Sequence, residues 1–160
     1  MRILTALVFT LLTVIAAGCA DKAPSAQART TDSPVPASPP ADDLPAPFKG
    51  LPDVVEGTLE SPAGIVVPDE PGMLWVVTYG SGSNPELPRE VTADGQVITI
   101  VLANDEGRPS TMDYVPTTST IAIPEGVDAA QQIVVVLSDL GQVDVDLSTP
   151  GTVSWVSARG

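Results

Sequence analysis

Apolar residues divide the chain into three parts. From Ile3 to Ile15 they form a nearly continuous run that only threonines interrupt. From Ala20 to about Gly50 no apolar periodicity is present. Beyond Leu51, short apolar or alternating runs recur between turn residues, which is typical of a domain built from β-strands. The pattern therefore predicts an N-terminal apolar segment over residues 1–18, a linker over 19–50 and one folded domain over 51–160.

The clearest strand signals alternate between apolar and polar side chains. In "GQVITIVLA", residues 95–103, every second residue from Ile98 to Leu102 is a large aliphatic one. In "QVDVDLS", residues 142–148, the valines fall on one face and the aspartates on the other. Successive side chains of a strand point to opposite faces, so each segment is expected to bury one face. Further strands are predicted at "GMLWVVTYG" (72–80), "STIAIP" (119–124), "QIVVVLS" (132–138) and "GTVSWVSA" (151–158), with weaker ones near Val54–Leu59 and Ile65–Val67.

Turn residues separate these runs. Ala93-Asp94-Gly95 is a hairpin signal, and Ser138–Gly141 is expected to join two antiparallel neighbours. No stretch has the period of an amphipathic helix of ordinary length. Seven to nine short strands in about 110 residues predict an all-β domain, an immunoglobulin-like β-sandwich, with a partly closed barrel as the alternative. Trp75 is expected to anchor the core between the sheets, and Trp155 to cover an edge.

The N-terminal segment has the layout of a secretory signal. Arg2 supplies a positive charge, the apolar run follows, and small residues precede the single cysteine, Cys19. The run is too short to span a bilayer comfortably, which takes about 20 residues. The stretch "IAAGC", ending with Gly18 and Cys19, resembles the lipobox of bacterial lipoproteins.

The lipobox resemblance implies a lipid anchor. In that family a diacylglyceryl group, carrying acyl chains such as palmitate, is attached to the cysteine sulfur, and a peptidase cuts before the cysteine. Here the cut would fall between Gly18 and Cys19, which leaves the protein on the extracytoplasmic face of the cell membrane. The alternatives are an ordinary secretory signal with a coincidental cysteine and an uncleaved anchor.

The predicted linker is rich in Ala, Pro, Ser, Thr and Asp. Such a segment buries too little apolar surface to offset its conformational entropy, so residues 19–50 are expected to be a disordered tether. A glycosylated, mucin-like stalk is the alternative, because Ser and Thr lie beside Pro.

Net charge is concentrated in the domain. Residues 1–50 hold four cations and four carboxylates, so the remaining three cations and sixteen carboxylates of the chain give residues 51–160 the whole charge of −13. Nucleic-acid binding depends on cations that neutralise phosphates, so no nucleic-acid partner is expected. The composition favours a Gram-positive source.

The inventory of reactive side chains argues against an enzyme. The chain has no histidine, its one cysteine is assigned to lipid, and both lysines after the signal, Lys22 and Lys49, lie in the linker. No cofactor is expected. Gly80-x-Gly82 precedes prolines rather than a helix start, so the stretch is no phosphate loop.

Two weaker site hypotheses remain. The loop after Gly80 is a candidate interaction loop, formed by Tyr79, Asn84 and Arg89. The carboxylates of Asp105, Asp144 and Asp146 could supply oxygen ligands for Ca²⁺, although no stretch has the spacing of a dedicated calcium loop.

The stretches "VVTYGSGSNPELPREV" and "STMDYVPTTSTIAIP" resemble uncharacterised secreted β domains of actinobacterial type. In those domains two cysteines occur at the positions that match Asn84 and Ser110 here. The resemblance implies that these two positions lie close in space and that this chain lacks a disulfide found in its relatives.

These observations predict a lipid-anchored cell-surface lipoprotein that carries a non-enzymatic binding module for a partner in the envelope. The alternative is a lipoprotein that binds Ca²⁺ or a small ligand, and a more remote one is a hydrolase that uses only carboxylates.

Overall fold

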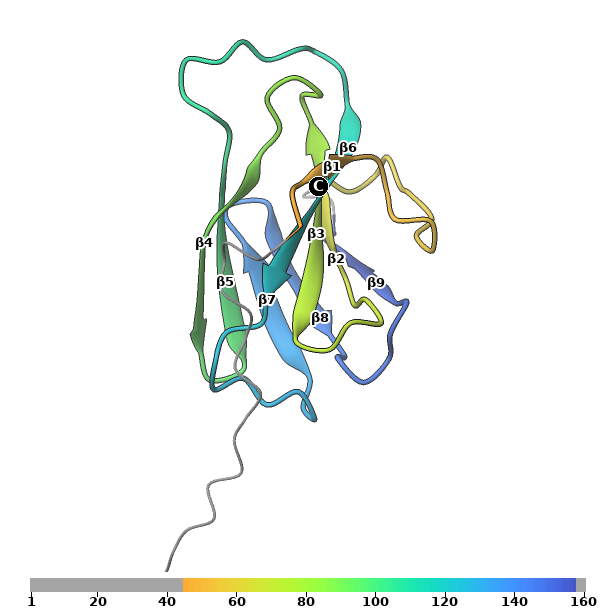
Figure 1. Cartoon of the computed structure of the whole chain (residues 1–160), viewed down its shortest axis with the longest axis vertical. Coiled ribbons are helices and arrows are strands. Elements are labelled where there is room, and N and C mark those ends of the chain that lie inside the picture. The colour runs from red at the N-terminus through yellow and green to blue at the C-terminus, as the bar shows by residue number, and fades with distance from the viewer. Residues whose placement is uncertain (1–44, 158–160) are drawn as a thin grey trace, which may run out of the picture. The chain divides into compact units, whose positions relative to one another are not determined.

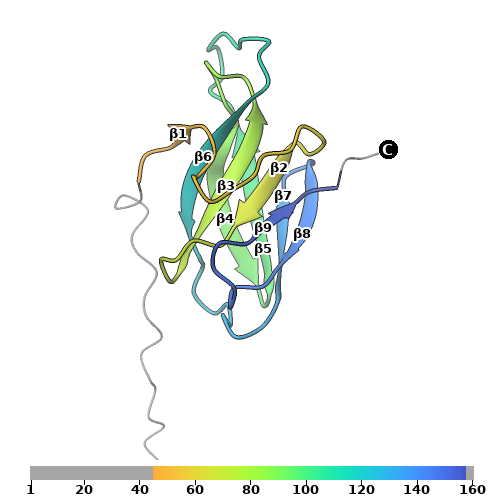
Figure 2. The ribbon, with the colours of Figure 1, turned by 90° about the vertical axis from the view of Figure 1, so that its right-hand side faces the viewer.

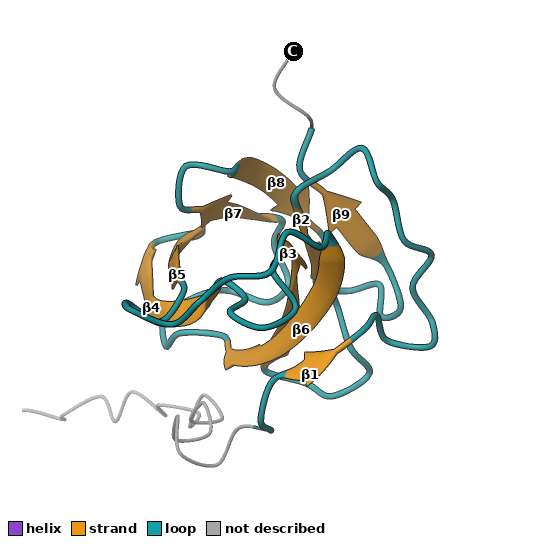
Figure 3. Cartoon of the chain, turned by 90° about the horizontal axis from the view of Figure 1, so that it is seen from above, coloured by secondary structure: helices purple, strands orange, loops and turns teal. Residues whose placement is uncertain are grey.

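The computed structural model describes residues 45–157, which form nine strands in two sheets. The predicted signal segment, Cys19 and most of the predicted linker lie outside the described residues. One sheet has the order β1-β6-β3-β2-β9 and the other the order β4-β5-β7-β8. Seen from above, the two sheets enclose a common interior (Figure 3). The prediction of an all-β sandwich is confirmed.

The five-stranded sheet is antiparallel throughout. Its central pair runs in full register over eight residues, from Met73 opposite Ala122 to Gly80 opposite Val115 (Figure 1). Its strands are β1 (Phe48–Lys49), β2 (Ala63–Val66), β3 (Met73–Gly80), β6 (Val115–Ala122) and β9 (Val153–Trp155).

The four-stranded sheet is mixed. Its strands are β4 (Leu87–Asp94), β5 (Val97–Ala103), β7 (Ile133–Leu137) and β8 (Gly141–Val145). Strands β4 and β5 form the predicted hairpin, whose turn residue Gly95 has φ 57°, a backbone conformation that glycine adopts without strain. Strands β7 and β8 are antiparallel, as predicted, whereas β5 and β7 run parallel.

The main core lies between the two sheets. Ile65, Leu74 and Val76 of one sheet are fully buried in the same cluster as Ile98 and Ile100 of the other. The alternation predicted for β5 is confirmed, because Val97 and Val101 on its opposite face are exposed. Asp144 is likewise exposed between buried valines in β8.

A second apolar cluster covers the outer face of the five-stranded sheet. The segment after β1 crosses this face (Figure 2) and buries Val55 against Val66 and Val77. Trp75 packs here and not between the sheets, so its predicted role was wrong. In β3 the side chains of Leu74 and Val76 occupy the interior, and alternation turns Trp75 outward.

Three segments differ from the sequence prediction. Strand β1 lies within residues 19–50, so the sandwich takes in the end of the predicted linker. Strand β4 was not predicted, because "LPREVTAD" is polar and contains Pro88, features typical of an edge strand. Residues 54–59 form no strand and lie in a mostly irregular loop. Between residues 45 and 157 there is no helix, and therefore none that could cross a membrane.

Candidate functional site

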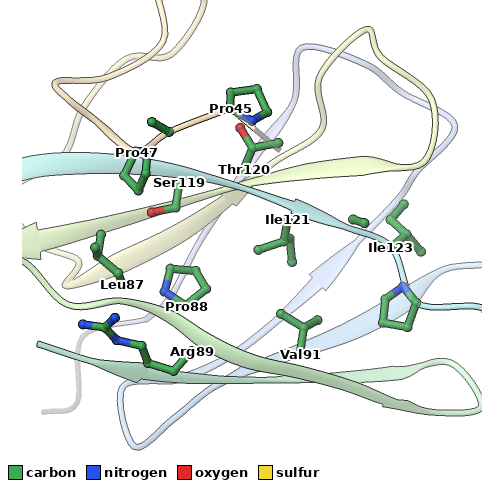
Figure 4. A pocket seen from close by; sticks show the side chains of 13 residues that line it. Pro45, Pro47, Leu87, Pro88, Arg89, Val91, Ser119, Thr120, Ile121 and Ile123 are labelled. Carbon is green, nitrogen blue, oxygen red and sulfur yellow. The ribbon is translucent and has the colours of Figure 1, made fainter. Parts of the chain in front are cut away.

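A groove opens where the edges of the two sheets approach each other, between β4 and β6. We call it the β4–β6 groove. It has a volume of about 580 Å³, within the usual range for ligand pockets. Figure 4 shows Leu87, Pro88 and Val91 of β4 facing Ser119 and Ile121 of β6 across it. Its remaining lining residues are Pro45, Ala46, Pro47, Arg89, Thr120, Ala122, Ile123 and Pro124.

Strand β4 forms one rim of the groove and is the outer strand of its sheet. Within the described residues it pairs only with β5, so its other edge has no strand beside it. The ladder shifts register between Pro88 and Glu90. Such a bulge twists an edge strand and re-aims its side chains, which helps to turn Val91 toward the interior.

Strand β6 forms the other rim and is only partly covered by β1. Register pairs Phe48 with Thr118 and Lys49 with Thr117, and the described residues supply no further strand partner on that side. Pro45, Ala46 and Pro47 lie directly before β1 and line the groove beside Thr120. The strand pairing with β6 stops at Phe48, midway along β6.

Backbone groups of the uncovered part of β6 face the groove side. The Pro116 carbonyl accepts from Gly50 on the β1 side, whereas the Ile123 N–H donates to Gly72 on the β3 side. Because these directions alternate along a strand, the N–H and C=O groups of Thr120 and Ala122 point to the β1 side. No hydrogen bond joins them to the described backbone there.

Ser119 adds a hydroxyl to this largely apolar lining. Its side chain is only 5% exposed, and no group between residues 45 and 157 hydrogen-bonds to its hydroxyl. The Ser119 hydroxyl is not a fully buried atom, so it can be reached from the groove. The Ser119 hydroxyl is thus a polar group inside the groove that a bound molecule could satisfy.

The predicted interaction loop does not form one surface. Tyr79 lies on the outer face of the five-stranded sheet, where its ring stacks on that of Tyr114 with centroids 5.2 Å apart. Its ring also makes a tilted contact with the indole of Trp155. Arg89 lies on β4 and forms an ion pair with Asp105. Asn84 is buried. Of the three, only Arg89 borders the β4–β6 groove.

Asn84 holds two loops together. Its Nδ2 donates to the carbonyls of Asp105 and Arg108, and its Oδ1 accepts from the Asp105 N–H. Next to it, the Ser83 hydroxyl donates to the Pro109 carbonyl. The loop after β3 and the long loop before β6, at the top of Figure 1, therefore lie side by side. The loop of Asn84 is thereby joined to the loop that contains Ser110, while the resemblance to secreted β domains stays a prediction.

Asp113, in the long loop before β6, adds a second link to the loop after β3 at Gly82. Its carboxylate accepts from the Gly82 N–H at 3.0 Å and from the Thr111 hydroxyl. These bonds, that of Thr111 first, hold the pKa of Asp113 below its ordinary value. The carboxylate thus serves to fix the loop.

The three candidate calcium ligands are not brought together as a cation site. Arg89, and more weakly Arg108, lower the pKa of Asp105 through a hydrogen bond and their charge. The Asp146 carboxylate accepts from the N–H and hydroxyl of Ser148, which lowers its pKa. Between residues 45 and 157, no three His, Cys, Asp or Glu side chains are grouped to hold a metal ion.

The β4–β6 groove was missed by sequence reasoning. The available signal was the edge character of β4, with Pro88 inside a polar stretch, together with prolines directly before Phe48. The sequence does not show that β4 and β6 lie opposite each other. The two strands belong to different sheets and are separated by β5 in the chain.

The chain was compared with protein-family models, curated proteins and solved structures, and none of them matches it.

Proposed function

We propose that this chain is a lipid-anchored protein of the extracytoplasmic membrane face whose β-sandwich is a non-enzymatic binding module. The β4–β6 groove carries the binding part of this proposal. It offers an apolar lining, an unpaired hydroxyl on Ser119 and open backbone groups on β6. These are features of a surface that receives another molecule.

The lipid anchor is supported by the residues around Cys19. The small residues before it and the apolar run up to Ile15 fit the lipobox pattern. The linker would then hold the sandwich away from the bilayer, where partners in the envelope can reach it. We also propose that the sandwich is of immunoglobulin-like type, which its two packed sheets and mostly antiparallel pairing support.

Cell fractionation tests the anchor. Cys19→Ser should move the full chain from the membrane fraction to the soluble extracytoplasmic fraction, while Ser25→Ala, a neutral change in the linker, should leave it with the membrane. If the Cys19→Ser chain stays with the membrane, the apolar segment itself is the anchor and the lipoprotein assignment fails.

Cross-linking on intact cells tests the binding role. A photo-reactive residue at Thr92, exposed on β4, should give discrete adducts with other envelope components. The same residue at Gln142, exposed on β8 in the far edge strand of that sheet, serves as the matched control. No adduct from either position would count against a binding module.

A further inference from the structure

We propose that residues 42–47 of this chain extend β1 along β6, pair with its open backbone groups and cover the β4–β6 groove. A partner molecule then reaches the groove only by displacing this segment. The pairing itself is independent of the proposed binding function, whereas the displacement rests on it. Part of the same segment already lines the groove, through Pro45, Ala46 and Pro47.

The register of β1 decides which residues would pair. Phe48 lies opposite Thr118, and the two strands are antiparallel. In such a ladder the register continues one residue at a time on both strands, unless a bulge interrupts it. The continued register gives two further pairs at the open positions of β6, Ala46 with Thr120 and Leu44 with Ala122. The segment therefore reaches the two β6 residues whose backbone groups have no described partner on that side.

The prolines of the segment lie where a ladder tolerates them. The Gly50 N–H donates to the Pro116 carbonyl, so every second residue before Gly50 would direct its N–H to β6. These residues all carry an N–H, namely Phe48, Ala46, Leu44 and Asp42. Pro45 and Pro47 occupy the positions between them, and an edge strand accepts proline where the missing N–H would face away from its neighbour. The first proline at an inward position is Pro40, where the ladder must end.

The same alternation brings proline rings over the groove. Residues that lie opposite each other in an antiparallel pair share one face of the sheet. Pro47 would thus share the face of Ser119, and Pro45 the face of Ile121, and all four residues line the groove. Figure 4 shows both prolines beside β6 at this place. Burying the apolar lining under these rings favours the covered state.

A strand from a partner protein and a second copy of this chain fit these positions less well. Either strand would have to pair with β6 directly beyond Phe48, where Ala46 and Pro47 of this chain already border the groove. The segment is covalently joined to β1, so its effective concentration at β6 is far above that of a separate molecule. A separate strand is therefore the competing outcome in the experiment.

A matched pair of proline variants tests the pairing. Leu44→Pro removes an inward N–H and sets a proline ring against the Ala122 carbonyl, so it should break the ladder there. Asp43→Pro introduces proline at an outward position and should leave the ladder intact. In the purified full chain in detergent, amide hydrogen exchange at Ala122 should be at least about tenfold faster in Leu44→Pro than in the wild-type chain or Asp43→Pro.

Leu44→Ala separates the backbone from the side chain. This variant keeps the N–H of residue 44, so Ala122 should stay protected as in the wild-type chain. Equal exchange at Ala122 in all four chains would overturn the pairing. Protection of Thr120 and Ala122 that rises with protein concentration would also overturn it, in favour of a second copy of the chain.

Cross-linking on intact cells tests the displacement. The photo-reactive residue at Thr92, exposed on β4, should give at least about threefold more adduct in Leu44→Pro than in Asp43→Pro, because the segment covers the groove only in the latter. Equal adduct yields in the two variants would overturn the displacement. If Ala122 exchanges faster in Leu44→Pro and Thr92 gives no adduct in either variant, the pairing stands, while the displacement and the proposed binding function both fail.

Discussion

The side chain of Asn84 binds the backbone of Asp105 at both of its polar groups. Its Nδ2 donates to the carbonyl at 3.0 Å and its Oδ1 accepts from the N–H at 2.9 Å. Asn84→Ala would leave the N–H and carbonyl of Asp105 and the carbonyl of Arg108 without this side-chain partner. We expect the free energy of unfolding to fall by about 1–3 kcal/mol, measured by urea denaturation.

Ser110→Ala is the matched control for that loss. Ser110 lies in the same loop but is exposed, so its substitution should change the free energy of unfolding by less than about 0.5 kcal/mol. Equal effects of the two substitutions would show that Asn84 does not hold the loops together.

Two adjacent threonines of β6 should respond in opposite directions to replacement by valine. Thr118 is fully buried, and its hydroxyl donates to the Gly50 carbonyl at 2.7 Å. Thr117 is nearly buried, and its Oγ1 is the one buried side-chain polar atom between residues 45 and 157 that lacks a partner. Valine has nearly the same shape as threonine, so the comparison isolates the hydroxyl.

We expect Thr118→Val to lower the free energy of unfolding by about 1 kcal/mol, because it removes a bond and leaves a carbonyl unpaired. Thr117→Val should leave the stability unchanged or raise it by up to about 1 kcal/mol, because it removes an unpaired hydroxyl. Thermal and urea denaturation measure both. A loss in Thr117→Val as large as that in Thr118→Val would mean that the Thr117 hydroxyl is paired.

Gly64 in β2 leaves room for the indole of Trp155 in β9. The two residues are opposite each other in the ladder, and a Cβ on Gly64 would lie 2.8 Å from the Trp155 Cζ3 atom and 3.1 Å from the Ser154 carbonyl oxygen. Gly64→Ala should therefore cost about 1–3 kcal/mol through overpacking and shift the tryptophan fluorescence.

Gly80→Ala is the control for this substitution, since a Cβ on Gly80 meets nothing within 4 Å. A double-mutant cycle with Trp155→Ala identifies the cause. If the ring is what clashes, the cost of Gly64→Ala should be smaller in the Trp155→Ala background. The same cost in both backgrounds would assign it to the backbone of Ser154.

Acid should weaken the ion pair between Arg89 and Asp105. The hydrogen bond from Arg89 and its charge hold the pKa of Asp105 below its ordinary value near 3.8. A carboxyl whose pKa is lower in the folded state stabilises the fold above its unfolded pKa, and this contribution is lost as the pH falls through the folded pKa. The pair is exposed, so its contribution is small and screened by salt.

Arg89→Gln should raise the pKa of Asp105, as followed by NMR titration of the carboxyl carbon. The difference in stability between the wild-type chain and Arg89→Gln should be present at pH 6 and should disappear as the pH falls below about 3.8. A difference that persists after the NMR titration shows Asp105 to be fully protonated would assign the effect of Arg89 to its hydrogen bond with the Ala103 carbonyl.

Strands such as β5 could be predicted from the sequence because the alternation of apolar and polar residues is a local property. Every second residue of β5 is buried, and the outer residues Val97 and Val101 are exposed, as the pattern required. Glycine at the tip of the β4–β5 hairpin likewise depends only on the backbone of the turn. Both features can be predicted without knowing which residues far along the chain pack against them.

Strand β4 and the role of Trp75 could not be predicted in the same way. An edge strand needs no apolar run, because neighbouring elements cover only part of it. The apolar run around Trp75 is buried on both faces, so its pattern does not tell which face meets the other sheet. That choice depends on the segment after β1, which covers the outer face.

The sequence by itself determined the strands with a regular apolar pattern, the hairpin turns, the charge of the domain and the proposal for Cys19, because these depend on neighbouring residues. Only the tertiary structure decided that Asn84 is a buried link between loops and that the edges of β4 and β6 face each other across a groove. Both results depend on contacts between residues far apart in the chain, and such contacts are set by the packing of the two sheets.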